Sequence, residues 1–221
     1  MPDIFDEVAE DLRADRTRAL LRKYGLLVVA AAVAVVVGAA GWEAWKSHRA
    51  SRMAEQANAY FASQALADGA QTGRALALPG FEKLIQTGDA GYRSLSRLRA
   101  AAIKAESGDL AGGVALWDQV SGDAEADPIL RDYATLQSAL HQIDTGDASA
   151  IQAKLQALTG PGSVWRPLAI EGEALLALRL SKTDPAQLGR ARDLFKSLAA
   201  DTTAPDGVRG RANGLLQRLG E

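Results

Sequence analysis

Residues 92–120 read YRSLSRLRAAAIKAESGDLAGGVALWDQV, and this stretch predicts the fold of most of the chain. Its first half carries Leu and Ala at helical spacing and ends in Gly108, a residue type that often terminates a helix. Asp109 follows at the position of a helix N-cap, and Trp117 and Val120 then place two large apolar side chains three residues apart. We therefore expect two helices joined by a tight turn.

The pair of large apolar residues recurs along the chain. Such pairs begin at residues 81, 117, 155 and 195, at intervals of 36, 38 and 40 residues. Turn signals that contain Asp recur at a similar period, and another apolar helix is expected before each of the last three. Two helices per repeat predict an all-α solenoid of stacked hairpins. The expected core residues are Phe81, Leu84, Trp117, Val120, Leu155, Leu158, Phe195 and Leu198.

The repeats are interpreted as degenerate tetratricopeptide-like units, because the period exceeds the usual ~34 residues and the W-x2-L-G motif is absent. Two tryptophans leave alternatives open. Trp117 could line a ligand groove, but the matching positions in the other repeats favour a core residue. Trp165, in the segment GPGSVWRPL, either faces a binding groove or packs as a staple at a helix start, with Ser163 as the candidate N-cap.

The segment from residue 24 to residue 42 reads YGLLVVAAAVAVVVGAAGW and contains no charge. As a helix it would be roughly 28 Å long, close to the hydrocarbon thickness of a bilayer. We predict a transmembrane helix over 24–45, which makes the lipid bilayer a partner of the chain. Its expected interface residues are the aromatic Tyr24, Trp42 and Trp45 and the basic Arg22 and Lys23.

Two other interpretations of this segment are less favoured. A cleaved signal peptide usually has a short basic start, whereas residues 1–23 are longer and carry acidic groups, although Gly38 and Ala40 imitate a cleavage site. A buried core helix is disfavoured by the charges on both flanks. The spacing of Ala30, Ala34 and Gly38 would allow close helix packing in lipid, but Ala and Gly are frequent throughout the chain.

Basic residues are more frequent before the apolar segment than after it, which favours a cytoplasmic N-terminus. We therefore expect a single-pass protein of a bacterial inner membrane. Residues 1–23 would form a cytoplasmic amphipathic tail that either docks a partner or is simply solvated. Residues 46–221 would form a periplasmic repeat domain, and the lack of cysteine is compatible with that oxidising compartment.

The composition and motifs do not point to catalysis. The chain has no cysteine, two histidines and a net charge of −2, which disfavours thiolate chemistry, histidine-rich metal sites and a general nucleic-acid-binding surface. Phosphate-binding, zinc-protease and serine-hydrolase motifs are absent. His141 could form a surface hydrogen bond with Asp144, but no nucleophile accompanies the pair. We expect no catalytic residues, no cofactor and no metal, and hence not an enzyme.

This layout resembles the ancillary subunit family of the SecYEG translocon. The resemblance covers nearly the whole chain and is strongest in Gly41–Tyr60 and in residues 92–120, and the start MPDIFDEVAEDLRADRTRALLRKYG is similar to the alphaproteobacterial form. It implies a membrane-anchored adaptor at the periplasmic exit of the translocon. Its expected partners are SecYEG, translocating polypeptides and periplasmic chaperones. The alternative is an assembly scaffold for an envelope complex, for example in cell division, with one dedicated protein partner.

Overall fold

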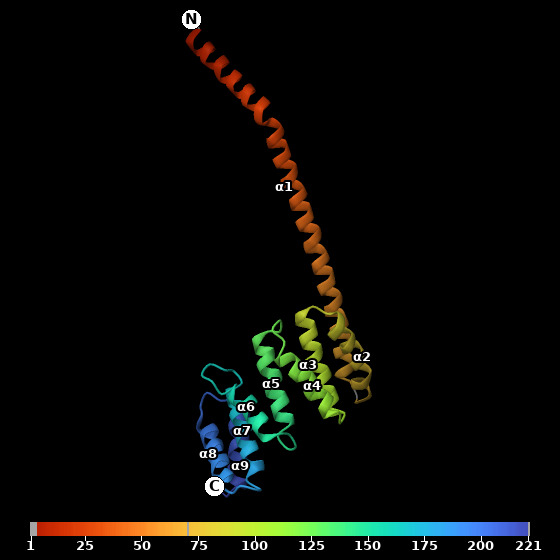
Figure 1. The fold of residues 1–221 in the computed structure, drawn as a ribbon, viewed down its shortest axis with the longest axis vertical. Coiled ribbons are helices and arrows are strands. Elements are labelled where there is room, and N and C mark those ends of the chain that lie inside the picture. The colour runs from red at the N-terminus through yellow and green to blue at the C-terminus, as the bar shows by residue number, and fades with distance from the viewer. Residues whose placement is uncertain (1–3, 70, 221) are drawn as a thin grey trace. The chain divides into compact units, whose positions relative to one another are not determined.

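The computed structural model describes residues 4–69 and 71–220, with side chains described for 22–69 and 72–220 (Figure 1). All regular secondary structure in these ranges is α-helical, which confirms the predicted fold class. The chain divides into two compact units, Met1–Glu55 and Gln56–Glu221. The helices are α1 Ile4–Ala67, α2 Gln71–Thr87, α3 Ala90–Glu106, α4 Leu110–Ser121, α5 Pro128–His141, α6 Ala148–Gln156, α7 Arg166–Leu180, α8 Ala186–Ala200 and α9 Asp206–Arg218.

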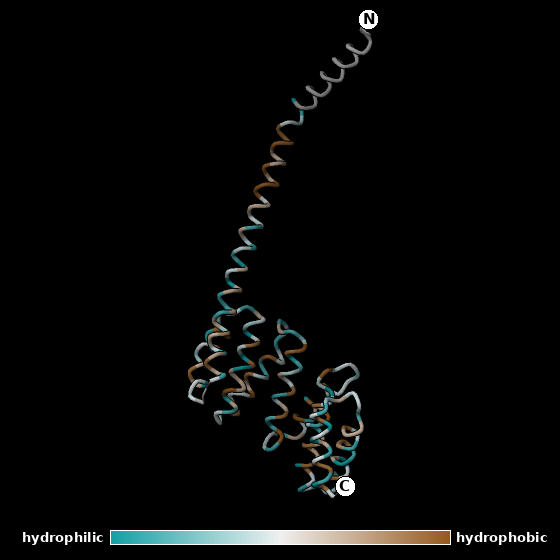
Figure 2. Tube along the Cα trace, turned by 180° about the vertical axis from the view of Figure 1, so that it is seen from behind, coloured by the Kyte–Doolittle hydropathy of each residue, from teal (hydrophilic) through white to brown (hydrophobic). Residues whose placement is uncertain are grey.

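The first unit consists of the N-terminal part of α1, which holds the apolar segment (Figure 2). An 18-residue window within Arg22–Ala67 has a mean hydropathy of 2.3 and buries none of its residues in the protein. This part of α1 is long and apolar enough to cross a membrane. The side chains of the predicted tail lie outside the described residues except for Arg22 and Lys23.

The predicted membrane-interface residues are exposed on α1. Arg22, Lys23, Tyr24, Trp42 and Trp45 all present their side chains to the surroundings of the helix. The rings of Trp42 and Trp45 lie 5.2 Å apart, and the Lys23 ammonium lies over the ring of Tyr24. Aromatic and basic side chains thus gather at both ends of the apolar segment. The sequence-based boundary at residue 46 marks the end of that segment, whereas the packed unit begins at Gln56.

The second unit is a stack of antiparallel helices in two layers. From α2 onward each helix packs against the next one in the chain, and α3, α5, α7 and α9 also contact one another in order. These four helices therefore form one layer, and α2, α4, α6 and α8 form the other. This arrangement is the hairpin solenoid that the repeat period predicts.

Aspartate side chains start three of these helices. Asp109 accepts a hydrogen bond from the Gly112 N–H at 2.9 Å, and Asp147 accepts one from the Ala150 N–H at 2.8 Å. Asp127 caps α5 in the same way. The α7 start differs from the predicted one. The helix begins at Arg166, and the Ser163 hydroxyl accepts from the Trp165 N–H at 3.3 Å, ahead of the first helical turn.

Four apolar clusters run through the second unit, and the buried residues of each come from three consecutive helices and their connections, with one helix shared between neighbouring clusters. The largest fully buried side chains are Trp117, Phe81 and Phe195. Trp117 therefore lies in the core and not on a groove. The structure buries all eight residues of the sequence-derived core set, namely Phe81, Leu84, Trp117, Val120, Leu155, Leu158, Phe195 and Leu198.

Candidate functional site

The connection between α6 and α7 is the longest one in the second unit's described residues and spans 157–165. Its sequence Gly160-Pro161-Gly162 disfavours a helix, because proline lacks an N–H group and glycine is a poor helix former. Gly162 has a φ of +91°, a backbone conformation that residues with a Cβ rarely adopt. The segment therefore leaves α6 as a loop whose backbone turns at Gly162.

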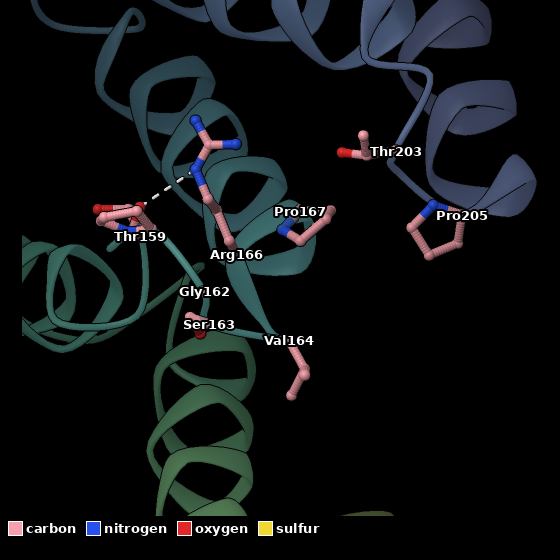
Figure 3. A pocket seen from close by; sticks show the side chains of 9 residues that line it. Thr159, Gly162, Ser163, Val164, Arg166, Pro167, Thr203 and Pro205 are labelled. Atoms are coloured by element: carbon pink, nitrogen blue, oxygen red, sulfur yellow. Dashed lines mark hydrogen bonds between the residues drawn. The ribbon is translucent and has the colours of Figure 1, made fainter.

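This loop forms one wall of a cavity of about 540 Å³ (Figure 3). The opposite wall comes from the connection between α8 and α9, which contributes Thr203 and Pro205. The volume lies within the usual range for ligand pockets of roughly 300–1,000 Å³. Val164 contributes an apolar side chain to the cavity lining, and 69% of this residue is exposed. The complete lining is Thr159, Pro161, Gly162, Ser163, Val164, Arg166, Pro167, Thr203 and Pro205.

Arg166 is the charged residue of this lining. Its Nε donates a hydrogen bond to the carbonyl oxygen of Thr159 at 3.2 Å, which orients the guanidinium group. Its guanidinium lies 4.0 Å from Oδ2 of Asp201, and 46% of its side chain is exposed. The cavity thus combines proline rings and Val164 with a partly exposed cation.

The carboxylate of Asp201 accepts hydrogen bonds mainly from within its own turn. The Thr203 hydroxyl donates to Oδ1 of Asp201 at 2.6 Å, and the Thr203 N–H donates to the same oxygen at 2.9 Å. These two bonds hold the pKa of Asp201 below its usual range, with a smaller contribution from Arg166. Asp201 is therefore anionic at neutral pH, and it orders the α8–α9 connection.

Trp165 belongs to the packing behind the loop. Its ring is partly buried, packs against the cluster of α5, α6 and α7, and lies 5.2 Å from the ring of Tyr133. Among the residues that the structure describes, the cavity is lined by the neighbours Val164 and Arg166 and not by Trp165. Sequence reasoning missed these neighbours, although the GPG segment marked the loop that carries them.

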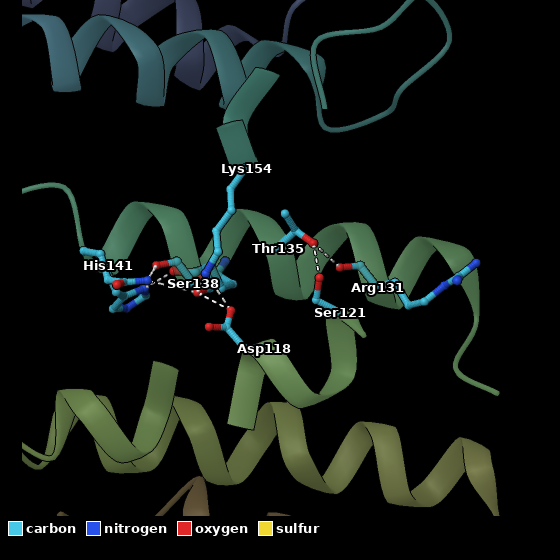
Figure 4. A network of polar contacts seen from close by, with 9 residues as sticks. Asp118, Ser121, Arg131, Thr135, Ser138, His141 and Lys154 are labelled. Atoms are coloured by element: carbon cyan, nitrogen blue, oxygen red, sulfur yellow. Dashed lines mark hydrogen bonds and ion pairs between the residues drawn. The ribbon is translucent and has the colours of Figure 1, made fainter. Parts of the chain in front are cut away.

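A second polar feature lies where α4, α5 and α6 meet (Figure 4). The Lys154 ammonium lies 2.7 Å from Oδ1 of Asp118 and 2.8 Å from Oγ of Ser138. The Ser138 hydroxyl in turn donates to Asp118 at 2.7 Å, and Ser138 is fully buried. Because its central hydroxyl is fully buried, we interpret this network as a structural link between the three helices.

His141 lies beside this network but does not make the predicted contact with Asp144. Its Nδ1 is 2.9 Å from the carbonyl oxygen of Gln137, one turn earlier in α5. Its ring lies 4.4 Å from the ring of Trp117. His141 therefore covers the core tryptophan. Within the described residues, no cluster of three or more His, Asp or Glu side chains could hold a metal ion.

Comparison of the sequence with known protein families agrees with the helical architecture. A family model described as a tetratricopeptide repeat-like domain matches residues 18–182, from the end of the N-terminal tail to the end of α7. No curated protein and no solved structure matches the chain. The match covers most of the sequence, and helical repeats of this kind mediate protein–protein interaction. The chain belongs to the tetratricopeptide repeat-like domain family.

Proposed function

We propose that this protein is a non-enzymatic adaptor, anchored in the bacterial inner membrane by α1, that binds polypeptides as they leave the Sec translocon. In this proposal the N-terminus is cytoplasmic and the repeat domain is periplasmic. The repeat domain contacts emerging chains or the periplasmic chaperones that receive them. The observation that carries the proposal is the fusion of a fully exposed apolar helical segment to a tetratricopeptide repeat-like domain in one chain.

The cavity between the α6–α7 and α8–α9 connections is the proposed contact site for the polypeptide. Pro161, Pro167 and Pro205 offer rigid apolar surface, which accepts an apolar side chain without ordering flexible groups. Arg166 adds N–H donors that suit a main-chain carbonyl or a carboxylate. Such a site recognises features common to many polypeptides and requires no particular sequence.

Anchoring beside the exit site would compensate for weak binding. A tethered domain meets its ligand at an effective concentration in the millimolar range when the linkage is short. Weak and reversible contacts are then sufficient, and they let the polypeptide move on to fold. The proposal therefore predicts that the anchor is required for capture even though the repeat domain folds without it.

The test is site-specific photo-crosslinking of the full-length protein in its own membrane. A photoreactive residue at Val164 lies on the cavity wall, and one at Ala186, exposed at the opposite end of α8, serves as the control. The proposal predicts crosslinks to translocating polypeptides, chaperones or translocon subunits at residue 164 and few at residue 186. Mass spectrometry identifies the crosslinked proteins.

A second sample contains only residues 46–221, with its helicity checked by circular dichroism. Loss of the crosslinks in this sample, with the fold intact, would support the anchored mechanism. Equal crosslinking with and without the anchor would contradict it. Recovery of a single stoichiometric partner by the anchorless domain would favour the assembly-scaffold alternative.

A further inference from the structure

The two ends of the repeat domain differ in their chemistry. The C-terminal helix α9 exposes polar side chains, among them Arg211, Asn213 and Arg218. The first hairpin, by contrast, exposes Phe61 at 64% and Leu76 at 67%. The end repeats of a solenoid normally carry a polar outer face, because no neighbouring repeat covers them. The C-terminal end meets this requirement and the N-terminal end does not.

The exposed surface of the first hairpin, here called the N-terminal end face, is defined by α1 and α2. Helix α1 turns Gln56, Ser63 and Ala67 inward, and the ring of Tyr60 lies 5.6 Å from that of Phe81 on α2. The other side of α1 is exposed, and no charged residue occurs in the α1 segment 56–67. The exposed residues of the face are Asn58, Phe61, Ala62, Ala65, Leu66, Ala75 and Leu76.

We propose that a second copy of this chain covers the N-terminal end face, with the two α1 helices parallel and in contact. One uncharged track of mostly small residues on α1 leads into this face with the alternating three- and four-residue spacing that brings paired helices into contact. The charged residues nearby, Lys46, Arg49, Arg52 and Glu55, all fall off this spacing. The positions on it are Ala44, Ser47, Ser51, Ala54, Asn58, Phe61 and Ala65.

Three observations favour a second copy over a different protein. The α1 part of the face, residues 56–67, contains no charge, so two identical α1 surfaces meet there without repulsion. In a parallel pair of this register, Glu43 of one copy stands near His48 of the other, and no like charges face each other across the seam. Asn58 is the one amide on the seam, the type of residue that fixes register in paired helices.

The exposure of α1 supports the same conclusion. All side chains from Leu26 to Glu55 are exposed, including those of 46–55, which lie beyond the apolar segment. Helices in proteins gain most of their stability from packing against a neighbour. Two chains whose apolar segments cross one bilayer in the same direction would bring identical α1 positions to the same depth. The pairing does not depend on the translocon role proposed above.

The cysteine-free sequence allows a direct test by single-cysteine crosslinking of the full-length protein in its membrane. Ala65→Cys lies on the seam, and Ala59→Cys is a matched control, also exposed but about 120° around the helix from residue 65. Under mild oxidation we expect a disulfide-linked homodimer for Ala65→Cys and about tenfold less for Ala59→Cys. Adding Phe61→Glu to Ala65→Cys should reduce the crosslink to the control level.

Labelling with a maleimide first establishes that both thiols are accessible. Equal crosslinking at the two positions, or none at residue 65 despite full labelling, would refute the pairing. A crosslinked product whose mass is not twice that of the chain would mean that a different protein covers the face, and would refute it as well. Because Phe61 and Ala65 are exposed, their substitution leaves the monomer folded, which unchanged helicity of each variant verifies.

Discussion

Lys154 on α6 lies 2.7 Å from Asp118 on α4, so two helices of the same layer are joined across α5. Ser138 of α5 takes part in the same network and is fully buried. The ion pair itself is partly exposed and contributes little alone. Its importance comes from the buried hydroxyl, whose loss of a hydrogen-bonding partner is costly.

The variant Asp118→Ala is expected to destabilise the repeat domain by about 1–2 kcal/mol, because Ser138 loses its acceptor and Lys154 loses its counter-charge. Urea unfolding of residues 46–221 measures the change. Asp132→Ala removes an exposed carboxylate from α5 and should change the stability by less than about 0.5 kcal/mol. Equal effects of the two substitutions would show that the network does not join the helices.

Two glycine-to-alanine substitutions are expected to act in opposite directions. A Cβ at Gly113 on α4 would lie 2.7 Å from the carbonyl oxygen of Ala101 on α3, so Gly113→Ala should force these helices apart and cost about 1–3 kcal/mol. At Gly210 on α9 a Cβ meets nothing within 4 Å. Gly210→Ala should therefore stabilise the domain by about 0.5–1 kcal/mol through its higher helix propensity.

Thermal unfolding of the two glycine variants beside the parent domain gives both signs in one experiment. A neutral or stabilising Gly113→Ala would contradict the close approach of α3 and α4. A destabilising Gly210→Ala would contradict the open surface of α9.

The ion pair of Glu171 and Arg211 joins α7 to α9 through two bonds of 2.6 Å. Glu171 is buried and Arg211 is about half exposed. Arg211→Ala leaves a buried carboxylate without its partner, and we expect a loss of about 2 kcal/mol in the free energy of unfolding. Replacing both residues with leucine should recover most of that loss, because no charge is then left buried. Chemical denaturation of the single and double variants, with Arg218→Ala as an exposed control, measures these changes.

If the double variant were less stable than Arg211→Ala, the cost would come from lost packing and not from the uncompensated carboxylate. That result would contradict the electrostatic account of the pair.

The capping aspartates should make the domain sensitive to acid. The Gly112 N–H, followed by the Lys104 ammonium, lowers the pKa of Asp109. The Ser149 hydroxyl, followed by the Ala150 N–H, lowers the pKa of Asp147. A carboxyl group with a lowered folded-state pKa stabilises the fold above its unfolded pKa of about 3.9 and loses that contribution as the pH falls through the folded value.

The double variant Asp109→Asn/Asp147→Asn still has side chains that can cap helices but no longer titrates at these positions. Its urea midpoint should therefore fall less between pH 7 and pH 3 than that of the parent. Identical pH profiles of the parent and the double variant would show that these two caps do not contribute to the acid sensitivity of the domain.

The repeat period predicted the solenoid because each hairpin buries the same type of residue at the same place, as Phe81 and Phe195 illustrate. The caps at Asp109, Asp127 and Asp147 were also predictable, since capping is a local interaction. The cavity was not, because Val164 and Thr203 come together only through the stacking of two hairpins. A single sequence has no local signal for such a meeting.

The start of α7 was predicted too early because Ser163 has the right chemistry for a cap, whereas the turn around Gly162 delays the helix to Arg166. The N-terminal end face was equally hidden, since its lack of charge has meaning only once α1 is seen to begin the stack. Local features such as helix caps could thus be predicted from the sequence, whereas contacts between repeats could not.

The sharing of helices between successive core clusters has a consequence for how this protein can change in evolution. Each cluster involves only helices that follow one another in the chain, so gaining or losing one hairpin would rebuild a single junction and leave the others intact. The family match ends at residue 182, before α8 and α9, which complete a cluster of their own with α7. The length of the domain is therefore a quantity that selection can adjust in whole hairpins, without redesigning the remaining core.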